Sequence, residues 1–257
     1  MWKQLAKSVQ GWGHKRLETV CQDSCLTNIC HAGTETILVL AAADGAGSAD
    51  HSDIGSQIAC RVIHEAIAAH LNQRSALTEV TKEQALDWYQ QVRQTLDHEA
   101  ETRAVPVRQF ACTLLVAVIG ENAAVFCQIG DGAIIIRDAG ELRPVFWPQS
   151  GEYANTTNFV TSPKFADDLV FAWHDCRIDD VSVLTDGLQC VALNFATRQA
   201  HSPFFTPLFD ALRQHPNPTE LHGPMVAFLE SKNLAERTDD DLTLILATRV
   251  IPNDSLL

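Results

Sequence analysis

Short apolar runs joined by three-residue turns are the feature that most restricts how this 257-residue chain folds. The turns Gly120–Asn122 and Gly130–Gly132 each separate two such runs. A connection this short joins antiparallel strands, because a parallel pair needs a crossover of a dozen or more residues. The sequence therefore predicts two hairpins, 112–119 with 123–129 and 123–129 with 133–137. The full set of predicted strands is Thr36–Ala43, Cys112–Ile119, Ala123–Ile129, Ala133–Arg137, Val181–Thr185 and Leu242–Thr248.

Two long stretches between these strands have helical periodicity. Apolar residues recur at helical spacing along Asp53–Gln73 and along Thr81–Arg103. Thr81 and Gln84 have the spacing of a capping box. A further helix is expected after Pro224, over Met225–Leu229. Strands in hairpins with helices between them predict one α+β domain over residues 1–257, with two facing antiparallel sheets, a β-sandwich, covered by helices.

The charge of the chain disfavours two kinds of partner. It has 32 acidic and 19 basic residues, a formal net charge of −13. Nucleic acids and anionic membrane surfaces both attract basic proteins, so we expect neither as a partner. No apolar run reaches the roughly 20 residues of a membrane helix, and the first 15 residues lack the apolar core of a secretory signal. The expected location is therefore the cytoplasm.

The eight cysteines have two interpretations. In a cytoplasmic chain they are expected to be reduced thiols, and Cys112, Cys127 and Cys190 lie in apolar runs typical of core residues. The alternative is a zinc site formed by Cys21, Cys25, Cys30 and His31, whose spacing matches no common zinc motif.

Four aspartates share one local setting, at the end of an apolar run. Asp44, Asp131 and Asp186 are each followed by glycine, and Asp240 lies in a run of three aspartates. Carboxylate oxygens at rigid strand ends suit hard cations such as Mg²⁺ or Mn²⁺. A single Asp-Gly pair is more often a turn than a ligand. The recurrence predicts an oxygen-ligand metal site, with ordinary turns as an equal alternative.

The order and spacing of these motifs resemble those of the metal-dependent protein phosphatases of type 2C, the PPM family. The resemblance runs from about Gly11 to Ala247. Its motifs are GWGHKRLETVCQDS, ADGAGS, CTLLVAVI with QIGDGAIII, VLTDGLQ and DDDLTLIL. The segments CQDS, DGAGS, GEYANTTNF and PFFTPLF resemble a bacterial branch of small serine/threonine phosphatases with a CQD first motif.

This resemblance implies a fold and a metal centre. The implied fold is a sandwich of two antiparallel sheets with helices on both outer faces. The implied centre binds two Mn²⁺ or Mg²⁺ ions, with an optional third. The implied metal ligands are Asp44 as the bridge between both ions, the Gly45 carbonyl at the second ion, Asp186 and Asp240 at the first ion, and Asp131 with Asp186 at the third.

Four positions near the N-terminal motifs complete the implied site, three of them as departures. Asp23 is expected to orient metal-bound water. Gln22 replaces the family's glutamate and is expected to contact metal-bound water with less charge. His14 stands nearest to the family's phosphate-binding arginine, as a phosphate ligand or acid, although a solvated loop residue is an equal alternative. Ala46 replaces a histidine expected to protonate the leaving group.

The implied activity is hydrolysis of phosphoserine and phosphothreonine in proteins by a metal-activated hydroxide. The expected partners are a phosphorylated protein substrate and a cognate serine/threonine kinase. Two alternatives remain open, namely a pseudophosphatase or phosphoprotein-binding regulator, and a hydrolase of small phosphoesters. The polar segment Gln149–Phe159 is expected to shape substrate access, through Asn155 and Thr156, with a plain surface turn as the alternative.

Overall fold

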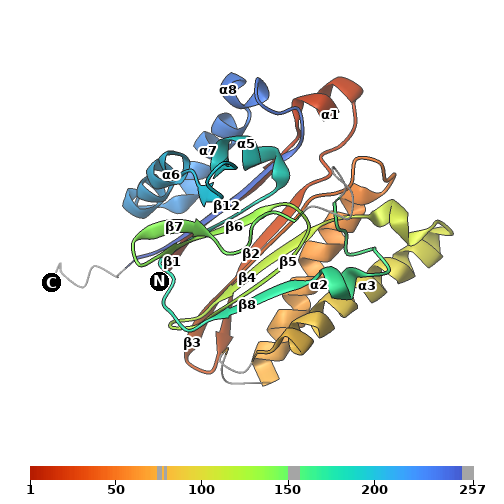
Figure 1. Ribbon diagram of the computed structural model, residues 1–257, viewed down its shortest axis with the longest axis horizontal. Coiled ribbons are helices and arrows are strands. Elements are labelled where there is room, and N and C mark those ends of the chain that lie inside the picture. Colours follow the sequence, from red (N-terminus) through yellow and green to blue (C-terminus); the bar gives the residue numbers. More distant parts are fainter. Residues whose placement is uncertain (74–76, 78–79, 150–156, 251–257) are drawn as a thin grey trace.

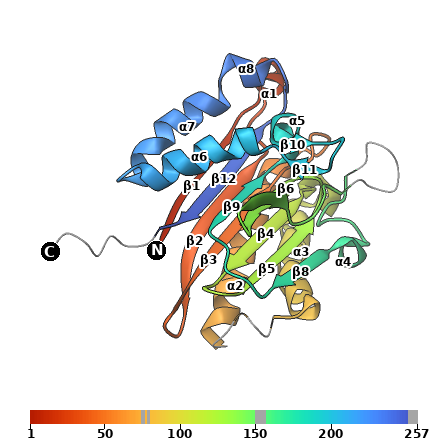
Figure 2. The ribbon, with the colours of Figure 1, turned by 60° about the vertical axis from the view of Figure 1, so that its left-hand side comes forward.

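Two five-stranded antiparallel sheets form the centre of the molecule (Figures 1 and 2). The computed structural model describes residues 1–73, 77, 80–149 and 157–250. Sheet I contains, in spatial order, β1 (Trp2–Val9), β12 (Leu242–Arg249), β9 (Asp180–Leu184), β6 (Ala133–Asp138) and β7 (Glu141–Pro144). Sheet II contains β2 (Ser24–Ala32), β3 (Glu35–Ala43), β4 (Leu114–Ile119), β5 (Ala124–Ile129) and β8 (Val170–His174). The α+β sandwich predicted from the sequence is confirmed.

The core between the sheets is aliphatic. Leu38, Leu115, Ile134 and Ile245, from four different strands, are fully buried there. The six strands predicted from the sequence are all interior strands of their sheets, and their bounds agree within about two residues. An interior strand that is covered on both faces reads as a continuous apolar run, which is why the sequence revealed it.

Helices cover both outer faces, as expected. On sheet II lie α2 (Ser52–Gln73) and α3 (Lys82–Arg103), and Thr81 forms the predicted capping box with Gln84. The outer face of sheet I carries shorter elements: α5 (Gln189–Ala192), α6 (Ser202–Gln214), α7 (His222–Leu229) and α8 (Lys232–Ala235). Helix α7 begins two residues before Pro224 rather than after it.

The smaller elements of the chain connect these layers. They are α1 (Trp12–Leu17), η2 (Val107–Phe110), α4 (Phe165–Asp168), η3 (Asp186–Leu188), η4 (Pro218–Leu221) and the two-residue pair β10 (Leu193–Asn194) and β11 (Gln199–Ala200). No helix in the described ranges combines the length and the apolar character needed to span a bilayer.

The second predicted hairpin is wrong. β4 and β5 pair as expected, but β5 then pairs with β8, and β6 belongs to the other sheet. Gly130 has a φ of +115°, a backbone conformation that glycine adopts without strain, and here it turns the chain out of sheet II. The buried Gln128 amide donates hydrogen bonds to the carbonyls of Gly130 and Gly132, at 2.9 and 3.0 Å. The turn around Asp131 is therefore a fixed crossing between the sheets.

The zinc alternative is also wrong for geometric reasons. Cys25 packs into the core between the sheets, whereas Cys30 packs on the helix-covered face of sheet II. The two cysteines are five residues apart on β2, and residues separated by an odd number point to opposite faces of a strand. They are therefore unable to bind one ion. All eight cysteines are free thiols.

Candidate metal centre

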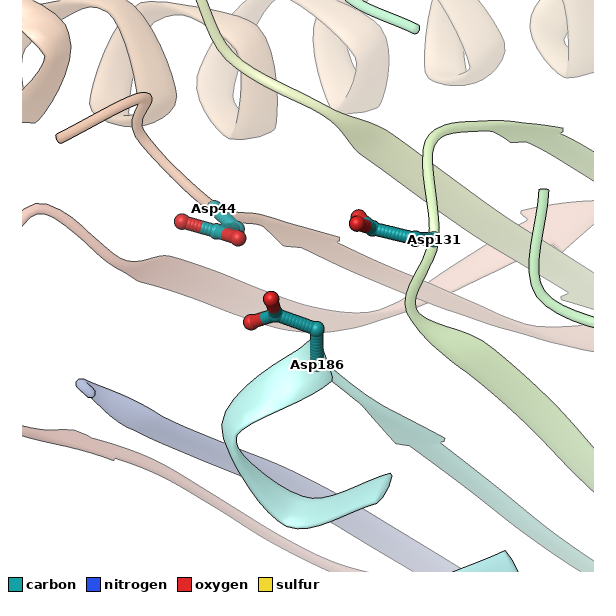
Figure 3. A group of neighbouring side chains, drawn as sticks. All are labelled: Asp44, Asp131 and Asp186. Carbon is teal, nitrogen blue, oxygen red and sulfur yellow. The ribbon is translucent and has the colours of Figure 1, made fainter. Parts of the chain in front are cut away.

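Three aspartates from different strand ends point toward one another (Figure 3). Asp44 follows β3, Asp131 lies in the crossing between β5 and β6, and Asp186 follows β9. Each offers a carboxylate oxygen, and these three oxygens all lie within 4.8 Å of one another. The carboxylates are partly buried. Each is fixed by a strand end, which is a rigid platform for a ligand set.

Burial and mutual repulsion disfavour ionisation of this cluster. Burial, reinforced by the nearby Asp23, Asp186, Asp240 and Asp131, raises the pKa of Asp44 well above its usual range. Burial and the charges of Asp131 and Asp240 raise the pKa of Asp186 to about 7. Burial also raises the pKa of Asp131. Such a cluster is electrostatically incomplete, and divalent cations would stabilise its charged form.

Asp240 lies beside this cluster rather than within it. It lines the same hollow of about 410 Å³ as Asp44 and Asp186. Its side chain is turned in part toward its own backbone, because one carboxylate oxygen accepts a hydrogen bond from the Asp241 N–H at 2.8 Å. The trio with the closest oxygens therefore contains Asp131, whereas the sequence placed Asp240 in the core of the site.

Gly45 occupies a position where no larger residue fits. It lines the hollow beside Asp44 and forms an isolated β-bridge with Cys112. A Cβ atom there would lie 2.7 Å from the backbone oxygens of both Gln22 and Ser52. The glycine that follows Asp44 is therefore required by close backbone packing.

Asp23 lies behind the metal-facing carboxylates in the core. Its Oδ2 accepts hydrogen bonds from the hydroxyls of Thr185 and Thr243, at 2.8 and 2.7 Å. Burial raises the pKa of Asp23 to about 8, against the lowering effect of these two hydrogen bonds. Thr185 precedes Asp186 directly, so Asp23 connects the N-terminal motif to the strand end that carries a candidate ligand.

Asp241 is a residue that the sequence reasoning missed. It is buried, and its two oxygens accept hydrogen bonds from the N–H groups of Gly11 at 2.7 Å and Gln22 at 2.6 Å. Its Oδ1 also lies 2.8 Å from His14 Nδ1. One carboxylate thus holds three parts of the N-terminal segment against the start of β12. The triple aspartate run was visible in the sequence, but nothing in it distinguished the buried member.

Known proteins allow the family of this architecture to be identified. The sequence pattern of the family described as Protein phosphatase 2C matches residues 10–229. The chain belongs to the protein phosphatase 2C family. The match spans most of the chain, including the segments that carry Asp23, Asp44, Asp131 and Asp186.

Relatives of this phosphatase 2C chain agree in sequence and in fold. It is 34% identical over 251 residues to serine/threonine-protein phosphatase 3 of Escherichia coli, a match covering 96% of this chain and 98% of the relative. It also superimposes on the catalytic domain of the serine/threonine phosphatase PstP in complex with two manganese ions, with a TM-score of 0.60, 15% identity and coverage of 97% and 99%. The phosphatase Stp1 of Staphylococcus aureus gives a TM-score of 0.58, 16% identity and coverage of 98% and 96%.

The hollow of about 410 Å³ that contains Asp44, Asp186 and Asp240 is called the metal hollow below. Among the described residues that line it, His14 is the one with a basic side chain. Its side chain is 17% exposed. Lys15 is engaged elsewhere, in a 2.8 Å contact with Glu230. Ala46, at the position where the family resemblance implied a histidine, is buried in a small apolar cluster with Ala49 and Ala111. His14 therefore lies where a phosphate ligand or acid was expected from the sequence. Ala46 has no group that can donate a proton.

The segment Gln149–Phe159 borders this site at both ends. Gln149 accepts a hydrogen bond from the Gly130 N–H at 2.7 Å, and the Thr157 hydroxyl donates to Asp131 Oδ2 at 2.7 Å. Thr157 and Phe159 line the hollow. Asn155 and Thr156, to which substrate access was assigned, lie outside the described residues.

Proposed function

We propose that this chain is a metal-dependent protein phosphatase that hydrolyses phosphoserine and phosphothreonine. The observation that carries the proposal is the trio Asp44, Asp131 and Asp186, whose carboxylate oxygens gather within 4.8 Å although their pKa values are raised. Family membership and the 34% identical serine/threonine-protein phosphatase 3 support the reaction and the class of substrate. We treat residues 1–257 as one domain, because β1 and β12, from the two ends of the chain, pair in sheet I.

The residues at the site fit Mn²⁺ or Mg²⁺. The candidate donors are all oxygens, which hard divalent cations prefer. Two buried oxygens there, Gln22 Oε1 and Asp131 Oδ1, have no hydrogen-bond partner within the described part of the chain. In this proposal Asp44 would be shared by two ions, Asp186 and Asp240 would bind the first, the Gly45 carbonyl and Gln22 would serve the second, and Asp131 with Asp186 would hold an optional third. Such ions supply a water of lowered pKa and neutralise charge on the phosphate.

The other residues of the site position these groups. Asp23 orients water in the centre through the oxygen that the two threonines leave free, and it keeps β9 and β12 in register with the N-terminal motif. Asp241 fixes His14 and the backbone of Gln22. His14 then contacts a phosphate oxygen at the wall of the hollow. The contacts of Asp23, Asp241 and His14 support these proposed roles. Ala46 lines the hollow without a proposed chemical role.

A second hollow supports a polypeptide substrate over a small phosphoester. It has a volume of about 580 Å³ and shares Ala46, Ser48, Thr157 and Phe159 with the metal hollow. Residues that flank a phosphorylated side chain would have room there, whereas a small phosphoester needs no such space. The exposed Arg108 lines this second hollow. We infer that Arg108 favours substrates with an acidic residue beside the phosphorylated one.

The pseudophosphatase alternative is based on Gln22 and Ala46 alone. Neither residue removes a carboxylate from the trio, so the geometry favours the enzyme. A serine/threonine kinase that phosphorylates the same substrates belongs to this proposal as a partner in the same pathway. So does a cytoplasmic location, which the eight free thiols support, because reducing compartments maintain that form.

The test is phosphate release with and without added Mn²⁺, measured on a phosphoserine peptide and on a small aryl phosphate. The wild-type protein is expected to hydrolyse both substrates with Mn²⁺ and neither after chelation. Asp44→Asn is expected to be inactive at every practical Mn²⁺ concentration. An Asp44→Asn variant with wild-type activity would contradict the two-ion centre.

The peptide part of the proposal needs its own variant. Arg108→Ala should lower kcat/KM for a phosphopeptide with an acidic neighbour by about 5- to 10-fold, which is typical of one lost charge-assisted contact at a surface. The rate on the aryl phosphate should stay unchanged. Arg103→Ala is the matched control, because Arg103 is an exposed arginine at the end of α3 that pairs with Glu99. Equal losses for the two variants would reject the role of Arg108.

A further inference from the structure

A basic hollow lies at the end of sheet I that is opposite to the metal centre. It has a volume of about 780 Å³, and the residues that line it include Lys3, Arg137, Arg177, Arg213 and Arg249. The start of β1 and the end of β12 form part of its wall, so the N-terminus in Figure 1 marks its place in the fold. The volume is in the range of cavities that hold small molecules.

The two sites lie at opposite ends of the same three strands. Asp131 precedes β6, whereas Arg137 lies near the end of that strand. Asp186 follows β9, whereas Asp180 begins it. Asp240 precedes β12, and Arg249 ends that strand. The basic hollow is therefore separate from the metal centre, and the centre does not explain it.

The charge of this hollow is opposite to that of the protein. Five of the chain's 19 lysines and arginines line it, with Asp179 and Asp180 as the acidic residues among its lining. Asp210, outside the lining, contacts Arg213 at 2.9 Å, so five positive and three negative charges leave a local excess of two positive charges in a chain with a net charge of −13. Cations concentrated in a hollow attract anions far more effectively than the same charges spread over a surface.

The guanidinium groups are held in place before any ligand binds. Asp180, whose side chain is fully buried, contacts Arg137 at 2.6 Å and Arg213 at 2.5 Å. Arg249 stacks over the Trp2 ring at 4.4 Å and donates hydrogen bonds to the carbonyls of Gly120 and Ile178. Groups ordered in advance lose little further freedom when a ligand binds, which favours affinity.

Arg177 and Arg249 share one carboxylate in the lining of the hollow. Arg177 contacts Asp179 through Nε at 2.8 Å, and its side chain is 46% exposed. Arg249, only 10% exposed, lies 3.8 Å from the same aspartate. Burial, followed by repulsion from Arg177, lowers the pKa of Arg249. An anion between these two guanidinium groups would relieve the repulsion.

We propose that this hollow binds a small molecule that carries a diphosphate group, either inorganic pyrophosphate or the diphosphate of a nucleotide. Planar guanidinium groups suit phosphate oxygens, with which they form paired hydrogen bonds. A diphosphate at neutral pH carries about three negative charges, given a second phosphate pKa of about 6. Each of its two phosphate groups can meet one pair of guanidinium groups, Arg137 with Arg213 and Arg177 with Arg249. A single phosphate would meet only one of these pairs. This inference does not depend on the proposed phosphatase activity.

The experiment is isothermal titration calorimetry on the full chain with a chelator present, so that no metal ion binds the anion at the acidic end. The probes are inorganic phosphate, pyrophosphate and adenosine diphosphate. Pyrophosphate is expected to bind at least about tenfold more tightly than phosphate, because it makes the second set of contacts. Binding of adenosine diphosphate as well assigns the site to nucleotides, and its exclusion assigns the site to inorganic pyrophosphate.

Arg177→Ala tests the location of the bound probe, and Arg61→Ala is the matched control. Arg61 is an exposed arginine on α2 that pairs with Glu65, so both variants remove one surface charge. Arg177→Ala is expected to weaken pyrophosphate binding roughly 10- to 100-fold, as for one lost charged contact to phosphate. Arg61→Ala is expected to leave it unchanged. Absence of pyrophosphate binding to the wild-type protein, or equal weakening by the two variants, overturns the proposal.

Discussion

Asp180 and Asp186 lie at opposite ends of β9, and their surroundings differ completely. Asp180 accepts from Arg137, Arg213 and the Thr248 hydroxyl, so its charge is compensated within the fold. Asp186 faces Asp44 and Asp131, and within the described residues none of these three has a lysine or arginine partner. A buried carboxylate with a structural role is paired with lysine or arginine side chains of the same protein. The end of the sheet that carries Asp44, Asp131 and Asp186, called the acidic end below, has no such partners within the described residues. This arrangement is expected where cations bind from solution.

Asp186→Asn should cause the largest loss of phosphatase activity among the variants of the acidic end. The variant removes a candidate ligand, so we expect phosphatase activity to fall at least about 100-fold at saturating Mn²⁺, because metal ligation contributes several kcal/mol to such reactions. It also removes one repelling charge, so the metal-free protein should unfold at a higher denaturant concentration. Asp87→Asn, on the exposed face of α3, is the control for charge loss alone. A variant that retains activity would remove Asp186 from the site.

Asp180→Asn should have the opposite signature. The neutral amide leaves Arg137 without its carboxylate and Arg213 with Asp210 alone, and breaking such a pair costs about 3–5 kcal/mol when both partners are buried. Because the two arginines are 25% and 37% exposed, we expect a loss of about 2–3 kcal/mol in the free energy of unfolding. Chemical denaturation measures it, with the neighbouring, half-exposed Asp179→Asn as the control. Equal stability of the two variants would show that Asp180 is not structural.

The two ends should also differ in their response to pH. The pKa of Asp23 is raised to about 8 and that of Asp186 to about 7, above their values in the unfolded chain. The folded state therefore binds protons more tightly, and this contribution to stability is full below pH 4 and is lost as the pH rises through 7 to 8. Metal-free protein should be roughly 3–4 kcal/mol more stable at pH 6 than at pH 8.5.

Added Mn²⁺ should reverse the trend. Metal ions compete with protons for the carboxylates, so the increase in melting temperature caused by Mn²⁺ should be larger at pH 8.5 than at pH 6. Thermal unfolding with and without Mn²⁺ at both pH values measures this. Metal-free stability that rises toward pH 8.5 would contradict the raised pKa values.

Gln22→Glu should have the smallest effect, a change in the Mn²⁺ concentration that gives the half-maximal rate. The Gln22 Oε1 atom is buried without a hydrogen-bond partner in the described part of the chain, so a charge placed there acts on the metals directly. We expect a several-fold lower Mn²⁺ concentration for half-maximal rate, from about 1 kcal/mol of added attraction. The metal-free variant should be less stable, because one more like charge joins the cluster. An unchanged metal titration would mean that the metal ions do not sense this position.

The strands show what the sequence could predict. The six interior strands were found because each is covered on both faces and is apolar throughout. Within the two five-stranded sheets, the four strands that were missed are the edge strands β1, β2, β7 and β8. In β2 and β8 most residues remain partly exposed, so no continuous apolar run marks them. An edge strand is specified mainly by its pairing with an interior strand, which is adjacent in sequence for β2 and β7 but distant for β1 and β8.

The site divides in a similar way. Asp44, Asp131 and Asp186 carried a local signature, an apolar strand followed by Asp-Gly, and the structure brings these three together. Asp241 had no such signature, because its role consists of contacts to Gly11 and Gln22, more than 200 residues away in the chain. The crossing at Gly130 was mistaken for a hairpin because its length fits both. Only the pairing of β5 with β8 decides between them.

The place of β12 in sheet I determines when the metal centre is completed during synthesis. β12 is the last strand in the described part of the sequence, yet it lies between β1 and β9 and pairs with both. Asp240 and Asp241 precede it directly, so until the ribosome releases this segment the N-terminal motif lacks the carboxylate that anchors it. Domains in general form during or soon after translation, and contacts between distant residues form late. A nascent chain in which the segment before β12 has not yet emerged therefore lacks Asp240 and the carboxylate of Asp241 that holds Gly11 and Gln22 in place.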